Sequence, residues 1–95
     1  MIERQVHFDV DPEKTAEFEE FFKTEYRPAM SKSPGFVQVD LLVDAKEPSH
    51  YQMVIRFQTQ ESSDAWRASA AHQALSPRLK AMYSGIQVMV YEVAA

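Results

Sequence analysis

The stretch Glu61-Ser-Ser-Asp-Ala-Trp-Arg-Ala-Ser-Ala-Ala-His-Gln-Ala-Leu75 holds the only tryptophan of the chain and one of its three histidines. Its good helix formers, uninterrupted by Gly or Pro before Pro77, predict one continuous helix. At about 100° per residue, that helix would place His72 within an apolar stripe and Trp66 at the rim of the stripe. The expected stripe consists of Ala65, Ala68, His72 and Leu75. It is either core packing or the wall of a pocket, and Ser63, Asp64 and Arg67 are expected to point away from it.

Four segments on either side of this helix alternate in the manner of strands, at residues 2–10, 36–44, 50–58 and 86–93. Asp11-Pro12 suits the start of another helix, which Pro28 should break or kink near its end, and Thr59 or Ser62 can cap the central one. A short helical turn is expected at 77–83. The order strand, helix, strand, strand, helix, strand is typical of the ferredoxin-like α+β fold, a four-stranded antiparallel sheet with both helices on one face. We expect residues 1–95 to form a single domain.

Composition excludes several classes of function. The formal net charge is −4, so nucleic-acid binding is not expected. There is no cysteine, which excludes disulfides, thiolate metal sites and a cysteine nucleophile. The start of the sequence does not resemble a signal peptide, and no apolar run is long enough to cross a membrane, so we expect a cytoplasmic protein without membrane contact. The histidines lie on separate predicted elements, so no metal site is expected.

The sheet face turned away from the helices is expected to be mixed in character. It carries polar residues beside apolar ones, among them Phe36, Leu42 and Val54. Such a face is too apolar to leave in water and too polar for a dry core, so the sequence predicts a homodimer formed through it. Arg56 in mid-strand is expected to pair with Asp40 or Asp9, because an unpaired charge there is costly.

Several of these segments together resemble the antibiotic biosynthesis monooxygenase (ABM) domain family. They are the acidic Phe-rich helix, Pro34-Gly35-Phe36-Val37 leading into a strand, and Ala65-Trp-Arg-Ala-Ser-Ala-Ala-His72. The resemblance implies a dimeric α/β barrel with a pocket between each sheet and its own helices. It also implies oxidation of polycyclic phenols by O2 without metal or flavin, or haem cleavage by an Asn, a Trp and a His. This chain has no asparagine, so haem cleavage is not expected.

Three residues are candidates for catalysis. His72 is either a base, because imidazole titrates near neutral pH, or a packed core histidine. Trp66 either stacks on a flat substrate or covers a sheet edge or the dimer seam. Glu25 lies on the flank of the apolar face of its helix, where a raised pKa would make it a base; otherwise it reaches solvent or pairs with Arg27 or Lys32.

Two functions remain open on this basis. The first is a cofactor-independent oxygenase for a small aromatic or quinol substrate, without cofactor or metal. The second is a non-catalytic dimeric barrel that binds a small apolar metabolite or serves as an accessory subunit. In the first, the substrate pocket is expected to be lined by Phe18, Phe22, Met53 and Phe57.

Overall fold

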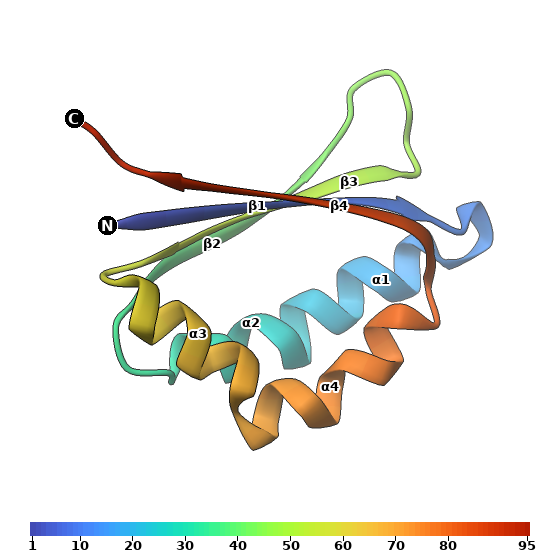
Figure 1. Ribbon diagram of the computed structural model, residues 1–95. Helices are drawn as coiled ribbons and strands as arrows, with labels where there is room; N and C mark the ends of the chain where they lie inside the picture. Colours follow the sequence, from blue (N-terminus) through green and yellow to red (C-terminus); the bar gives the residue numbers. More distant parts are fainter.

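The computed structural model describes residues 1–95 and contains one four-stranded antiparallel sheet. The strands are β1 (Ile2–Val10), β2 (Phe36–Val43), β3 (His50–Phe57) and β4 (Tyr83–Glu92), in the spatial order β2-β3-β1-β4. All helices cover one face of the sheet, and the other face carries none (Figure 1). The ferredoxin-like α+β fold predicted from the sequence is therefore confirmed. The last strand begins earlier than the predicted Ile86.

The first helical segment is continuous, although its geometry changes along its length. It comprises η1 (Pro12–Lys14), α1 (Thr15–Phe21), the π-helical η2 (Phe22–Tyr26) and α2 (Arg27–Ser31). As expected, the Asp11 side chain caps its start by accepting from the Glu13 N–H at 3.0 Å. Of the two outcomes predicted at Pro28, a break or a kink, the break does not occur, because the helical segment continues through this residue. Proline stands in the first turn of α2, and the wider π turn, in which the Arg27 N–H donates to the Phe22 carbonyl, carries the chain into it.

The second helical segment is not the single helix that the sequence predicts. It divides at Ser69 into α3 (Gln60–Ala68) and α4 (Ala70–Lys80), because Ser69 has an extended backbone with φ −67° and ψ 153°. Thr59 caps α3 by accepting from the Ser62 N–H, as expected. The separate turn expected at 77–83 is instead the end of α4, which runs through Pro77.

The break also changes which face of α3 is buried. The predicted stripe is wrong for Ala65 and Ala68, which are both exposed, whereas Ser63 and Trp66 are buried. Since α3 ends at Ala68, its orientation is set by its own nine residues and not by the stripe of a longer helix. Ser63 and Trp66, three residues apart, form its inward face.

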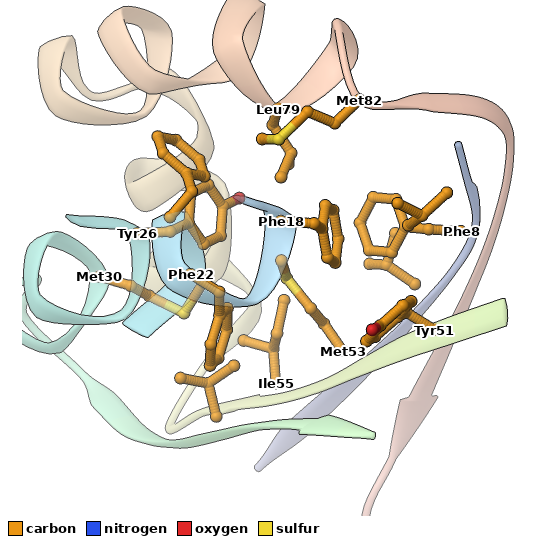
Figure 2. Close-up of a cluster of buried hydrophobic side chains, with 14 of the residues drawn as sticks. Phe8, Phe18, Phe22, Tyr26, Met30, Tyr51, Met53, Ile55, Leu79 and Met82 are labelled. Carbon is orange, nitrogen blue, oxygen red and sulfur yellow. The ribbon is translucent and has the colours of Figure 1, made fainter. Parts of the chain in front are cut away.

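Aromatic side chains fill the core between the sheet and the helices. Phe18 is completely buried, and its ring lies 5.4 Å from that of Phe8 on β1 and 5.2 Å from that of Tyr51 on β3 (Figure 2). Phe36 was expected on the opposite sheet face but packs against this core, edge-on to Phe57. A register shift between Phe36 and Gln38 turns the side chain inward, as β-bulges do.

The helix-free face of the sheet carries ion pairs among apolar side chains. Arg56 was predicted to pair with Asp40 or Asp9, but its Nε lies 2.8 Å from the Glu3 carboxylate. The reason is register: Glu3 stands directly opposite Arg56 on the neighbouring strand. Leu42 on this face is 49% exposed. None of the helices has the length and apolar character needed to cross a membrane.

Candidate functional site

A cavity of about 360 Å³ lies between the sheet and the helices, within the usual range for small-ligand sites. Most of its lining is hydrophobic, and every layer of the fold contributes to it. The sheet supplies Arg4, Val6, Phe8, Met53, Ile55, Phe57, Tyr83 and Ile86. The helices supply Tyr26, Ser63, Trp66, Arg67, His72, Ser76, Leu79 and Lys80.

Strand β1 brings a charged side chain to the helix side of the sheet. Val6, Phe8 and Val10 on this strand are buried in the core. Successive side chains of a strand point to opposite faces, so Arg4 shares the face of Val6 and Phe8. Arg4 is half-buried and lines the cavity. An arginine therefore occupies a position in the apolar series of its strand.

The π-helical turn places Tyr26 in the cavity wall. Tyr26 is the last residue of η2, and its ring packs edge-on against that of Trp66 at 5.8 Å. Burial raises the pKa of the Tyr26 phenol to about 12, although its hydrogen bond with Trp66 and the charge of Arg4 act in the opposite direction. The phenol is therefore neutral at physiological pH.

The interruption at Ser69 brings Trp66 and His72 together. In an uninterrupted helix, residues six positions apart would project about 120° from each other around the axis. Here the two rings lie 5.3 Å apart, edge to face. The Ser69 hydroxyl donates to the Trp66 carbonyl at 2.6 Å and accepts from the His72 N–H at 3.2 Å, so one side chain joins the two helix ends.

Replacing Ser69 with alanine is expected to lower the free energy of unfolding by about 1 kcal/mol, the usual loss for an N-cap. It should also shift the NMR resonance of the single indole N–H, because Trp66 and His72 lose their shared restraint. Urea denaturation gives the first quantity. Ser31→Ala is the matched control, since the Ser31 hydroxyl only donates to the Pro28 carbonyl on an exposed turn. A Ser69→Ala protein as stable as the Ser31→Ala control would contradict this account of the break.

His72 lies in surroundings that favour its neutral form. Its ring is partly buried, and this burial is the largest cause that lowers the pKa of the imidazole. The charges of Arg67, Arg4 and Lys80 lower that pKa further, against a hydrogen bond to the Arg67 backbone that raises it. At neutral pH the imidazole is uncharged, so it can accept a proton.

The structure places some of the predicted site residues in the cavity wall and others outside it. His72, Trp66, Met53 and Phe57 all line the cavity. Phe18 and Phe22 do not: both are almost entirely enclosed in the core. The catalytic roles of His72 and Trp66 stay predictions.

Glu25 stands outside the cavity, and the alternative in which its pKa is raised is wrong. Its carboxylate lies 2.7 Å from the Arg78 guanidinium on α4. The hydrogen bond from Arg78 is the main cause that lowers the pKa of Glu25. The other alternative was that Glu25 reaches solvent or pairs with Arg27 or Lys32; its side chain is 42% exposed, but its partner is Arg78. The partner belongs to another helix, which the spacing within the Glu25 helix could not reveal.

Sequence reasoning missed the polar lining of the cavity. Ser63 and Arg67 were expected to point away from the sheet, yet both line the cavity, because α3 turns a different face inward. Arg4 did carry a signal, since it occupies an even-numbered position among Val6, Phe8 and Val10. The sequence contains no comparable signal for Lys80, because the direction in which its side chain points depends on where α4 begins.

The fold and this cavity define a class of small α+β domains with a ligand-sized hollow between sheet and helices. The model of the family "Antibiotic biosynthesis monooxygenase" matches residues 1–78, and the chain belongs to this family. No protein of curated function matches the sequence.

Solved structures of the same fold are distant in sequence. A family member from Nitrosomonas europaea superimposes with a TM-score of 0.89 at 18% identity, each chain covered completely. SnoaB, a cofactor-independent oxygenase from Streptomyces nogalater, gives 0.89 at 18% identity, over 99% of this chain and 93% of that one. A conserved protein from Methanosarcina mazei gives 0.86 at 20% identity, over 95% and 89%. At such identities the similarity shows the fold alone.

Proposed function

We propose that this protein is a cofactor-independent monooxygenase that oxidises a small phenolic or quinol-type aromatic substrate inside the cavity. The observation that carries the proposal is the placement of a neutral imidazole, His72, beside the indole of Trp66 in a largely apolar hollow. Membership of the family supports the class of reaction, and the description of SnoaB as a cofactor-independent oxygenase is consistent with it.

The chemistry requires little more than proton removal and exclusion of water. An electron-rich phenol that loses its proton becomes a strong enough reductant to react with O2 directly, and His72 is the group placed to accept that proton. For an anthrone, the balance is one CH2 group plus O2 giving one carbonyl group plus water. The substrate supplies all the electrons, one oxygen atom enters it, and the other leaves as water.

The rings around the cavity suit a flat substrate. Trp66 is only 3% exposed and is held edge-on by both Tyr26 and His72. An indole fixed in this way is a rigid surface against which an aromatic ligand can pack. A substrate bound there would displace water from the imidazole, which strengthens every electrostatic interaction within the site.

The test is a panel of anthrones and hydroquinones under air, with quinone absorbance and O2 uptake followed together. Turnover of an anthrone with one O2 consumed per carbonyl formed supports the proposal, whereas oxidation of a hydroquinone with release of H2O2 inserts no oxygen atom and does not count as support. Binding of these compounds without O2 uptake above the uncatalysed rate would refute it. That result would favour the alternative, a non-catalytic domain that binds a small metabolite or acts as an accessory subunit.

We also propose that the protein is a homodimer formed through the helix-free sheet face. Leu42 and Tyr91 on this face are 49% and 48% exposed, beside the pair formed by Arg56 and Glu3. A second copy would cover these apolar groups and supply partners for the polar ones.

Analytical ultracentrifugation at micromolar concentration should show twice the 10.9 kDa chain mass. Leu42→Asp is expected to shift the equilibrium to the monomer by at least about tenfold, because it buries a charge in the seam. Lys23→Asp on the helix side is the control and should leave the dimer intact. A wild-type protein that sediments only as a monomer would overturn the dimer.

A further inference from the structure

The cavity concentrates positive charge within an acidic protein. Arg4, Arg67 and Lys80 all line it, and none of its lining residues is a carboxylate. The chain as a whole has a formal net charge of −4. Cations gathered in a partly enclosed hollow with apolar walls produce a strong local positive potential. The positive charge is therefore a property of this site and not of the protein surface in general.

Two cations of this group, Arg4 and Lys80, have no carboxylate partner, and of these two only Arg4 is half-buried, since Lys80 is exposed. The structure contains four ion pairs between Lys or Arg and a carboxylate, and a contact between His50 and Asp9, and Arg4 takes part in none of them. Arg56, on the opposite face of the same sheet, is paired with Glu3 at 2.8 Å. Asp64, whose charge acts on Arg4, is already bound to Arg67 at 2.6 Å.

An unpaired, half-buried guanidinium on the core face of a strand is unfavourable for folding. Burial lowers the pKa of Arg4, and the nearby charge of Arg67 lowers it further, so the folded chain holds two cations in mutual repulsion. A bound anion would neutralise the buried charge of Arg4 and reduce its repulsion with Arg67. The arrangement is therefore that of a binding site whose counter-charge comes from the ligand.

We propose that the ligand of this cavity is an aromatic carboxylate, with its ring against Trp66 and its carboxylate held by Arg4. The planar guanidinium matches a carboxylate in a bidentate geometry, and Arg67 and Lys80 add charge around it. The remaining lining is mainly hydrophobic and suits the ring. This inference rests on the same cavity as the proposed function and specifies its substrate class. It also excludes the purely apolar ligand of the alternative function.

Binding can be measured without turnover, because Trp66 gives the only indole N–H signal of the protein. Naphthalene-2-carboxylate and its neutral isostere naphthalene-2-carboxamide are titrated into the ¹⁵N-labelled protein. We expect the carboxylate to bind at least about tenfold more tightly, the usual gain from a charge-assisted hydrogen-bond pair. Arg4→Gln should reduce this preference to about twofold or less.

Arg27→Gln is the matched control, because Arg27 is exposed and its guanidinium lies over the Phe22 ring, outside the cavity lining. It should preserve the preference for the carboxylate. Lys80→Gln supplies a second variant at an exposed position, in case Arg4→Gln does not fold. It should weaken carboxylate binding by about threefold and leave carboxamide binding unchanged, as expected for loss of one partly screened charge.

Three results would each overturn the inference. They are equal binding of the two compounds, an undiminished preference in whichever variant folds, and an indole signal that millimolar carboxylate does not move. Tighter binding of 2-naphthyl phosphate than of the carboxylate would also overturn it in favour of a phosphate ligand. Carboxylate binding with no O2 uptake refutes only the oxygenase. Oxidation of neutral anthrones without carboxylate preference refutes only this inference.

Discussion

Replacing His72 with glutamine is expected to lower the rate of anthrone oxidation by about two orders of magnitude, the usual contribution of a positioned general base. Glutamine keeps a polar side chain of similar reach but cannot take up a proton. Binding of the substrate, read from the indole signal of Trp66, should change by less than about threefold, since the ring-packing surface remains. The rate at saturating substrate therefore falls while affinity is largely preserved.

His50→Gln is the matched control for this experiment. His50 lies at the start of β3, where its ring faces the Asp9 carboxylate at 3.0 Å, and it does not line the cavity. This variant should retain the wild-type rate. If His72→Gln oxidises anthrones as fast as His50→Gln, the proton is accepted by another group and the proposed role of His72 is wrong.

The pH dependence of the wild-type rate tests the same residue independently. Because burial and three neighbouring cations lower the pKa of His72 from its ordinary value of 6.5, more than half of the imidazole is still neutral at that pH. The active form is the neutral one, so the rate should fall to half of its value at neutral pH only below pH 6.5. A decline centred above pH 6.5 would contradict the assignment of His72 as the base.

The lowered pKa of His72 also makes the stability of the folded protein depend on pH. The unfolded chain binds a proton at His72 near its ordinary pKa, whereas the folded chain resists that proton until a lower pH. Between these two values the unfolded state binds more protons, so the stability of the folded protein decreases as the pH falls through this window. A bound carboxylate would reduce the repulsion around His72 and move its pKa back toward the ordinary value.

The architecture was predictable because its signals are local. Alternation along the strands and the Asp11-Pro12 start depend only on neighbouring residues, and both survive in the structure. The resulting order of elements allows few topologies, so the sheet could be inferred without knowing any tertiary contact.

The site was less predictable, because its geometry depends on departures from regular structure. Ser69 reads as an ordinary helical residue, and only tertiary packing selects its extended conformation. That single change reorients α3, brings Arg67 to the cavity and joins Trp66 to His72. The partner of Glu25 comes from a helix 53 residues away in sequence, a pairing that no periodicity encodes. Arg4 is the exception, since alternation alone assigns it to the inward face of β1.

Replacing Phe18 with alanine is expected to lower the free energy of unfolding by about 3–5 kcal/mol, the range for an aromatic ring removed from a core. The side chain is fully buried and contacts rings from both central strands, so no neighbour can easily fill the space it leaves (Figure 2). For a small domain such a loss is a large part of the total stability. Urea denaturation measures it, at one fixed protein concentration because the proposed dimer would also contribute to stability.

Two further variants test whether the loss of stability in Phe18→Ala comes from the missing core volume or whether any substitution destabilises the fold. Phe18→Leu keeps most of the apolar volume and should lose less than about 1.5 kcal/mol. Val43→Ala, at a side chain 49% exposed on the edge strand β2, should change stability by no more than about 0.5 kcal/mol. Because Phe18 does not line the cavity, any Phe18→Leu protein that remains folded should still prefer the carboxylate over the carboxamide. Loss of that preference in a folded Phe18→Leu protein would mean that the core and the ligand site are not separable, contrary to the geometry described above.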